Sequence, residues 1–233
     1  MIDLLALPVG VGAAAGCTRC APASDVTYLS LAEIEALLTS APLADGVAIT
    51  GPEPFSHPEL PAVIASVRDV GISRIALETD GGALAVHGNA AGVLHAGVRH
   101  LWVRILGADD AAQDARTGRP GRSAAARVGV AAYRAAALEA AYPVVVTAIV
   151  PVCRHTLPEL PAIVAECGAR GFDAVRLIAA GPLPGSAAAV IAAACDTGMV
   201  NRVWVATDGG LPLPGSHHLH SGADGAPMGG DVR

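Results

Sequence analysis

The chain has 233 residues, of which 52% are hydrophobic, 15% charged and only 3% aromatic, with a formal charge of −6. This length suffices for one domain with a full core, and so apolar a composition excludes an intrinsically disordered chain. The acidic balance and the absence of a basic run argue against nucleic acid and anionic membranes as partners, and five cysteines are too few for a disulfide scaffold.

The start of the chain allows two interpretations. Residues 4–16 are apolar and small, and together with Cys17 they resemble a lipoprotein cleavage box. A secretory signal begins with positive charge, however, and the only charge before Cys17 is Asp3. No apolar run elsewhere reaches the ~18–20 residues of a membrane span. We therefore expect a cytoplasmic protein without a membrane segment, and an exported lipoprotein is the lesser alternative.

Short apolar runs alternate with helical stretches along the chain. Most runs are continuous rather than alternating, as in parallel strands that are covered on both faces. The expected strands are residues 2–7, 46–50, 74–78, 100–106, 144–150, 174–179 and 203–206, and the clearest helices are 31–38, 57–70, 123–141, 157–170 and 187–195. This order predicts a parallel α/β fold.

Two helix starts have nearly the same sequence. PELPAVIA at 58–65 recurs as PELPAIVA at 158–165, and each copy leads to a glycine and then to a strand. Units repeated by rotation favour a partial barrel, although one good helix start used twice would look the same. A doubly wound sheet shares the local pattern and is the competing architecture. The periodic pattern stops at Asp208, so we expect a core domain over 1–207 and a disordered Gly/Pro-rich tail over 208–233.

The chemistry of a parallel α/β fold lies at the carboxyl ends of its strands. After the first strand, Cys17 and Cys20 form a Cys-x-x-Cys pair, which could bind a metal or an iron–sulfur cluster, act as a redox dithiol, or be incidental. Cys153, Cys167 and Cys195 have no such spacing. Cys167 and Cys195 lie in predicted helices, and we expect them to be small buried side chains.

Charged side chains follow the next strands. Glu53 could hold an ammonium group by a charge-assisted hydrogen bond, or could be a surface carboxylate near a helix start. Arg104 is expected on the inner side of its strand, where it could pair with Glu78, with Asp80 or with a bound carboxylate. His57 and His155 are interpreted as loop or capping residues.

The order of these strands and of the motifs after them, over residues 2–206, resembles the radical SAM superfamily. Cys17 and Cys20 match the second and third cysteines of its Cys-x-x-x-Cys-x-x-Cys motif. TGPEP at 50–54 resembles the Gly-Gly-Glu-Pro loop of the family, and Thr79-Asp80-Gly81 resembles its Thr-Asn-Gly. Residues 103–121 resemble the fourth strand and the Asp-x-x-x-Gly-x-Pro-Gly segment of peptide-modifying members.

The resemblance implies a partial parallel (β/α)6 TIM-like barrel with a 4Fe–4S cluster at Cys17 and Cys20. It also implies binding of S-adenosylmethionine and formation of a 5′-deoxyadenosyl radical that modifies a substrate, for which a peptide is the expected class. The implied cofactor-binding residues are Gly51, Pro52, Glu53, Thr79, Asp80 and Arg104, and no catalytic residue is assigned.

The chain departs from the family pattern at three places. Ala13 stands where the first motif cysteine belongs, and Pro52 replaces the second glycine of Gly-Gly-Glu-Pro. In the fourth strand, where members often have Ser-x-Asp, this chain has Arg104 and Leu106. Alanine cannot ligate iron, and proline has no backbone N–H to donate. A cluster-deficient relative that serves as a binding or partner subunit is therefore the alternative function.

Overall fold

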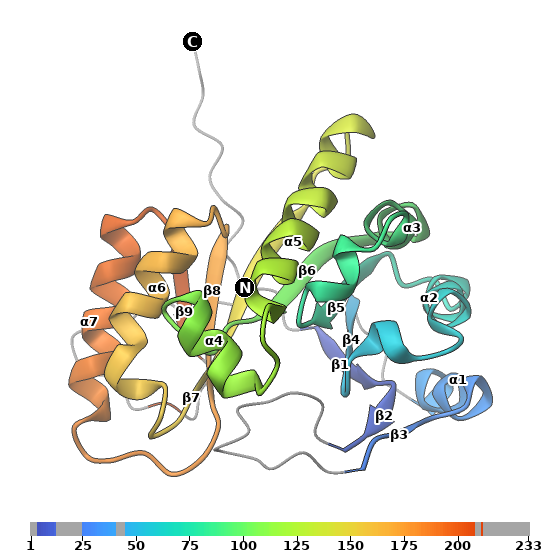
Figure 1. Ribbon diagram of the computed structural model, residues 1–233. Helices are drawn as coiled ribbons and strands as arrows, with labels where there is room; N and C mark the ends of the chain where they lie inside the picture. The colour runs from blue at the N-terminus through green and yellow to red at the C-terminus, as the bar shows by residue number, and fades with distance from the viewer. Residues whose placement is uncertain (1–3, 13–24, 41–44, 208–210, 212–233) are drawn as a thin grey trace.

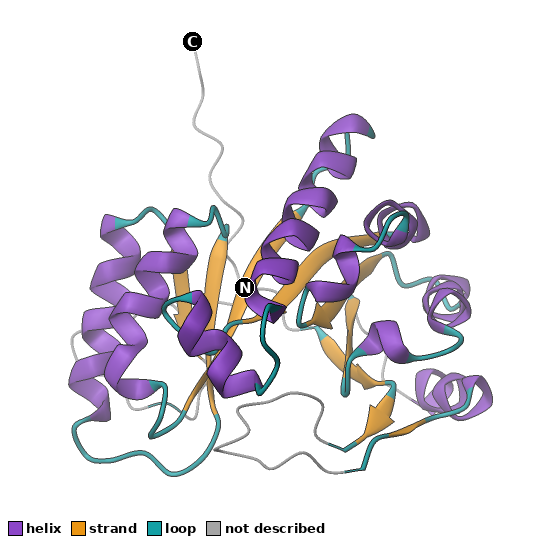
Figure 2. Ribbon diagram, viewed as in Figure 1, coloured by secondary structure: helices purple, strands orange, loops and turns teal. Residues whose placement is uncertain are grey.

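The computed structural model describes residues 4–12, 25–40, 45–207 and 211, and its main element is a parallel sheet (Figures 1 and 2). Seven strands pair in the order β1-β4-β5-β6-β7-β8-β9, every pair parallel. Their bounds are Leu5–Pro8, Gly46–Thr50, Arg74–Thr79, Val98–Arg104, Val145–Val152, Ala174–Ala179 and Trp204–Thr207. The predicted α/β class is confirmed, and each of the seven runs expected as strands contributes a strand to this sheet. The sheet has one strand more than the (β/α)6 arrangement that the resemblance implies.

The helices lie along one side of the sheet, with α1, α2 and α3 towards one end and α6 and α7 towards the other (Figure 1). A right-handed crossover between neighbouring parallel strands places its helix on one fixed face, so a sequential strand order puts every crossover helix on that face. A doubly wound sheet reverses its strand order in the middle, which this sheet does not do. The helices are Leu31–Ser40, Leu60–Asp69, Asn89–Ala96, Asp110–Thr117, Arg122–Glu139, Leu160–Ala169 and Ala187–Val200.

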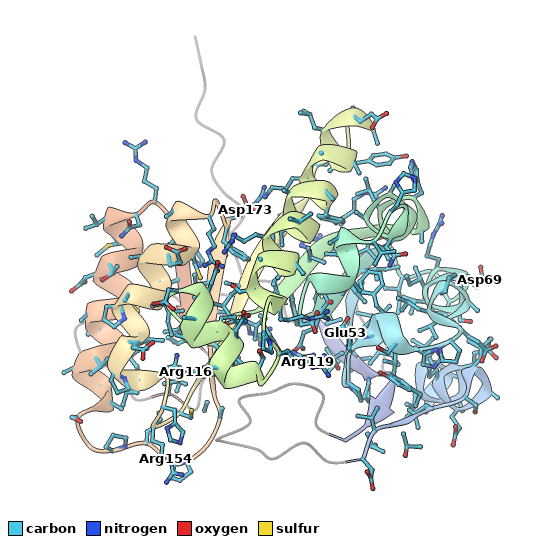
Figure 3. All side chains as sticks on the ribbon, viewed as in Figure 1. Glu53, Asp69, Arg116, Arg119, Arg154 and Asp173 are labelled. Atoms are coloured by element: carbon cyan, nitrogen blue, oxygen red, sulfur yellow. The ribbon has the colours of Figure 1, made fainter. Side chains whose placement is uncertain are left out.

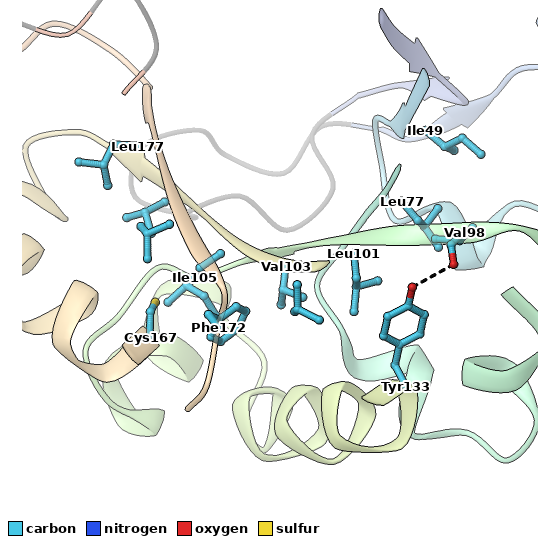
Figure 4. Close-up of a cluster of buried hydrophobic side chains, with 14 of the residues drawn as sticks. Ile49, Leu77, Val98, Leu101, Val103, Ile105, Tyr133, Cys167, Phe172 and Leu177 are labelled. Atoms are coloured by element: carbon cyan, nitrogen blue, oxygen red, sulfur yellow. Dashed lines mark hydrogen bonds between the residues drawn. The ribbon is translucent and has the colours of Figure 1, made fainter. Parts of the chain in front are cut away.

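The main core lies between the helices and the face of the sheet that they cover, which we call the outer face (Figure 4). The opposite face is the inner face. Alternate strand residues such as Leu77, Leu101 and Leu177 are fully buried there, as expected for side chains that share one face of a pleated sheet. Tyr133 of α5 is also fully buried, and its hydroxyl donates to the carbonyl of Val98 at 3.0 Å. Because the chain has few aromatic residues, most of the core consists of Leu, Ile, Val and Ala side chains.

The repeated helix starts occupy equivalent places. In α2 the residues Leu60, Val63, Ile64 and Val67 are buried, and in α6 the corresponding residues Leu160, Ile163, Val164 and Cys167 are buried as well. Each helix follows a short 3₁₀ turn and packs behind the strand that precedes it. The repeated sequence thus corresponds to two similar strand–helix units of one sheet.

Two helices and a hairpin were not predicted. The helix α3 begins after Gly88, without a side-chain cap, and it is short. The helix α4 carries a readable signal, because the Asp109 carboxylate accepts a hydrogen bond from the Ala112 amide at 2.7 Å. The antiparallel pair β2 (Gly10–Val11) and β3 (Thr27–Tyr28) is too short to leave a pattern.

Two further expectations concern the ends of the chain. The tail over 208–233 lies outside the described residues except for Leu211, which is buried. In the described part of the chain, no helix has the length and the apolar character that crossing a membrane requires.

Candidate functional site

The hairpin β2–β3 connects the first loop to the loop after β4. The Tyr28 hydroxyl donates to the carbonyl of Glu53 at 3.0 Å, and the Tyr28 ring meets the His57 ring edge-on. His57 is buried, with Nδ1 accepting from the Glu59 amide and Nε2 2.8 Å from the carbonyl of Leu29. The histidine therefore acts as a loop and capping residue, as its position before the helix indicated.

Cys17 and Cys20 fall in the segment 13–24, outside the described residues, and so does Ala13. The hairpin pairs Val11 with Thr27, which brings the two described ends of that segment together. These ends lie beside the loop after β4, because the Gly51 backbone approaches Gly10 so closely that a Cβ on Gly51 would lie 3.2 Å from the Gly10 carbonyl oxygen. Gly51 also has φ +111°, a conformation that side chains other than glycine rarely adopt.

Glu53 joins the loops that follow β4 and β5. One carboxylate oxygen accepts from the Thr79 hydroxyl at 2.6 Å, and the other accepts from the Asp80 amide at 2.8 Å. The side chain is buried, and burial, with the nearby Asp80 carboxylate as a second cause, raises the pKa of Glu53 above its usual value. These two hydrogen bonds fix the loop after β4 to the residues that end and follow β5.

The Asp80 side chain pairs with arginines. Its carboxylate accepts from Arg122 Nε at 2.8 Å and from the Gly82 amide at 3.0 Å, and Arg119 lies 3.8 Å away. The Asp80 side chain is only 7% exposed, whereas Arg122 is 24% exposed. Asp80 therefore fixes the turn after β5 to the start of α5.

Arg104 lies on the inner face of the sheet and pairs with Glu78. Arg104 Nε donates to the Glu78 carboxylate at 2.8 Å, and Nη2 donates to the Gly51 carbonyl at 3.0 Å. Of the partners considered for Arg104, the structure selects Glu78. The two side chains remain 11% and 20% exposed, so this charged pair borders open space beside the Gly51 turn.

The loop after β6 is held by α4. Gln113 is buried, and its side-chain oxygen accepts from the amides of Leu106 at 2.5 Å and Gly107 at 3.0 Å. Asp114 accepts from the amides of Gly121 at 2.5 Å and Ser123 at 2.8 Å, and so caps the start of α5. Gln113 and Asp114 thus hold the loop after β6 and the start of α5 in place.

The structure brings together most of the residues predicted as cofactor-binding: Gly51, Glu53, Thr79, Asp80 and Arg104 share direct contacts or a common partner, and Pro52 lies buried beside them. Figure 3 shows Glu53, Arg116, Arg119 and Arg154 along the same edge of the molecule, while Asp173, which precedes β8, lies away from it. Sequence reasoning named Glu78 only as a possible partner of Arg104, and it did not name Tyr28. Nothing in the sequence indicates Tyr28.

The other three cysteines are buried. Burial raises the pKa of the Cys167 thiol to about 12. A protonated, buried thiol is a poor metal ligand. Among the described residues there is no group of three or more His, Cys, Asp or Glu that could hold a metal ion. Any cluster would therefore depend on Cys17 and Cys20.

Comparisons with known proteins rest on structure alone. No protein-family model matches the chain. No curated protein matches it either. Among solved structures, it is similar to SuiB of Streptococcus suis bound to the precursor peptide SuiA, with a TM-score of 0.60 and 13% identity over 89% of this chain and 50% of SuiB. SuiB bound to S-adenosylmethionine gives a TM-score of 0.59 and 14% identity over 88% and 51%. The chain thus spans about half the length of SuiB, and over that half it has the fold of SuiB.

Proposed function

We propose that the chain is a radical SAM-type core that binds S-adenosylmethionine at the carboxyl edge of the sheet and acts on a peptide. The observation that carries the proposal is the Glu78–Arg104 pair beside the Gly51 turn. The methionine part of the cofactor is a zwitterion, and a partly exposed carboxylate–guanidinium pair offers a partner to each of its charges. The motif resemblance and the fold of SuiB, which has been determined with S-adenosylmethionine, support the same assignment.

The residues around the edge fit the cofactor in different roles. Arg104 would bind the carboxylate of the methionine moiety, and Glu78 together with the Gly51 carbonyl would accept from its ammonium group. Glu53 and Thr79 lie behind them, where they hold the loops after β4 and β5 in register. Bound to a reduced iron–sulfur cluster, S-adenosylmethionine supplies a 5′-deoxyadenosyl radical. The chain itself contributes the zwitterion site and the cysteines 17 and 20.

Charge removal at the edge should weaken cofactor binding. We expect Arg104→Gln and Glu78→Gln each to bind S-adenosylmethionine roughly 10- to 100-fold more weakly, because each loses a hydrogen bond to an ionised group. Titration calorimetry measures this, and thermal unfolding checks that the variants remain folded.

Glu159→Gln is the matched control, since Glu159 forms an ion pair with Arg116 at 2.6 Å and is 41% exposed. This variant should bind the cofactor like the parent. Unchanged affinity in both edge variants would place the cofactor elsewhere, and a parent that releases no binding heat at millimolar cofactor would refute the proposal.

The cluster decides between an active enzyme and a cluster-deficient binding or partner subunit. Ala13 removes one of the three thiolates that a 4Fe–4S cluster with an open iron site requires. We expect a labile cluster with less than full iron content in the parent. Ala13→Cys should raise the iron to about four per chain after anaerobic reconstitution and increase 5′-deoxyadenosine formation under dithionite.

Iron and sulfide quantitation with electron paramagnetic resonance measures the first effect, and chromatography of the nucleoside product measures the second. Ala14→Cys is the control, because it adds a thiol at the wrong spacing. If Ala13→Cys binds no more iron than the parent, the first loop is not a cluster loop, and the partner-subunit function is favoured.

A further inference from the structure

A cavity of about 260 Å³ lies in the helical layer, between α5 and the residues that follow α6. Its apolar floor consists of Val103, Ile105 and Phe172, whose side chains lie close together on the outer face of the sheet (Figure 4). The helices on either side pack away from it, α5 on α3 and on the short helix Gly82–Ala85, and α6 on α7. Side chains that border the cavity lack packing partners on that side, and a ligand would supply them.

One face of α5 forms the wall of the cavity. Residues 126, 127, 130, 131 and 134 line it, with the spacing of side chains that share one side of a helix. The neighbouring stripe of α5, with Tyr133 and Ala137, is buried in the main core. Ala131 is exposed, so it lies at the opening of the cavity.

Three arginines also line the cavity. They are Arg127, Arg134 and Arg170, and their side chains are 44%, 34% and 15% exposed. No acidic residue lines the cavity in the described part of the chain. The carboxylate partners of the arginines lie outside the lining, and they are Asp110, Glu166 and Asp173. A molecule in the cavity therefore meets guanidinium donors but no carboxylate.

Two of these arginines have donors for a further acceptor. Arg127 donates to Asp110 through Nη1, and its Nε and Nη2 have no acceptor among the described residues. Arg134 donates through Nη2 to Asp173 at 3.0 Å, and its buried Nε has no partner within the described ranges. A carboxylate in the cavity would accept a charge-assisted hydrogen bond from Arg127 and would interact favourably with the charge of Arg134.

We propose that this cavity binds a small apolar carboxylate, with its hydrocarbon body on the floor and its carboxylate on Arg127. An apolar cavity of about 150 Å³ holds one benzene molecule, so the larger cavity of this protein has room for roughly ten non-hydrogen atoms, the size of octanoate. A peptide segment fits less well, because its backbone N–H groups need acceptors, and the side chains of the lining are either apolar or donors.

The cavity is separate from the proposed cofactor edge and does not depend on it. Val103 and Ile105 flank Arg104 in the chain, and successive side chains of a strand point to opposite faces of the sheet. Arg104 therefore lies on the inner face, and the cavity lies on the outer face. A ligand in the cavity would pack behind the strand that carries Arg104.

Titration calorimetry with three compounds tests the site: octanoate, octanamide and butanoate. We expect octanoate to bind the parent about tenfold or more tightly than octanamide, which has the same shape without the charge. Butanoate should bind roughly 100-fold more weakly than octanoate, because each methylene group that is not buried costs about a factor of four.

Two variants locate the binding site. Ala131→Phe should lose octanoate binding, because the ring would fill the opening of the cavity. Ala124→Phe is the matched control, since Ala124 is an exposed residue of α5 outside the lining, and this variant should bind octanoate like the parent.

Arg127→Gln should bind octanoate no more tightly than octanamide. Asp110 would still accept from Ser123 at 2.7 Å and from Arg170 at 3.2 Å, so we expect this variant to fold, and thermal unfolding checks it. Arg154→Gln, on the exposed loop after β7 (Figure 3), removes the same charge elsewhere and should keep the preference for octanoate.

Three results would each overturn the proposed site. One is a parent that releases no binding heat with octanoate at millimolar concentration, and another is equal affinity of the parent for octanoate and octanamide. The third is unchanged octanoate binding in both Ala131→Phe and Arg127→Gln, which would show that octanoate adheres elsewhere on the surface.

Discussion

Gly129→Ala should destabilise the protein by about 1–3 kcal/mol, although alanine is the better helix former by about 1 kcal/mol. Gly129 lies in the middle of α5 and is buried against the short helix Gly82–Ala85. A Cβ there would lie 2.8 Å from the Leu84 Cβ and 3.0 Å from the Ala85 backbone nitrogen, and it would also collide with the Gly81 carbonyl oxygen. Backbone atoms cannot move aside as a flexible side chain can, so α5 would shift away from the loop after β5.

Gly92→Ala is the matched control for this prediction. Gly92 lies inside α3, is exposed, and has nothing within 4 Å of the position of an added Cβ. The same substitution should therefore stabilise the protein by about 0.5–1 kcal/mol. Urea unfolding followed by circular dichroism measures both variants. Two changes of the same sign would contradict the close packing of α5 on the loop after β5.

Asp80→Ala should cost about 2–4 kcal/mol, because removing one partner of a buried ion pair leaves the other charge without compensation. The expected loss of unfolding free energy is smaller than for a fully buried ion pair, because 24% of the Arg122 side chain is exposed. Asp80 also accepts from the Gly82 amide, which would lose its partner. The Asp80 amide donates to Glu53, so the loss of this turn should also weaken S-adenosylmethionine binding.

An ion pair with a second partner provides the comparison. Glu166 of α6 is 37% exposed and lies 2.7 Å from Arg170, which follows the last residue of α6. Arg170 also lies 3.2 Å from Asp110, so the loss of Glu166 leaves its charge paired. Glu166→Ala should therefore cost less than about 1 kcal/mol. Equal losses of unfolding free energy for Asp80→Ala and Glu166→Ala would show that the turn after β5 does not depend on its ion pair.

The sequence predicts the strands and the longer helices well, for a clear physical reason. Strands covered on both sides are continuous apolar runs, and β4 begins and ends at the predicted residues. A capping box forms at the start of α1, with the Ser30 amide donating to the Glu33 carboxylate at 2.7 Å. These features depend on residues close together in the chain, which a sequence pattern can contain.

The candidate site is predicted less completely, because its contacts join distant segments. Gly51, Glu53, Thr79 and Arg104 were identified by motif and position, and Glu78 was one of the partners considered for Arg104. The partners of Glu53 and Asp80 were not identified. Tyr28 contacts Glu53 across 25 residues, and Arg122 reaches Asp80 across 42. Contacts between residues so far apart in the chain leave no periodic pattern in the sequence. The segment with Cys17 and Cys20 lies outside the described residues, so its role as a cluster loop stays a prediction.

The sequential strand order has a consequence for how the chain folds. Apart from the interval between β1 and β4, each strand of the sheet pairs with the next strand along the chain, so no strand waits for a partner at the far end of the protein. Loop closure between such neighbours is inexpensive in entropy, and each new strand–helix unit can be added to the edge left by the previous one. During synthesis the sheet could therefore grow from β1 towards β9 as the polypeptide emerges, with one exposed edge at each stage.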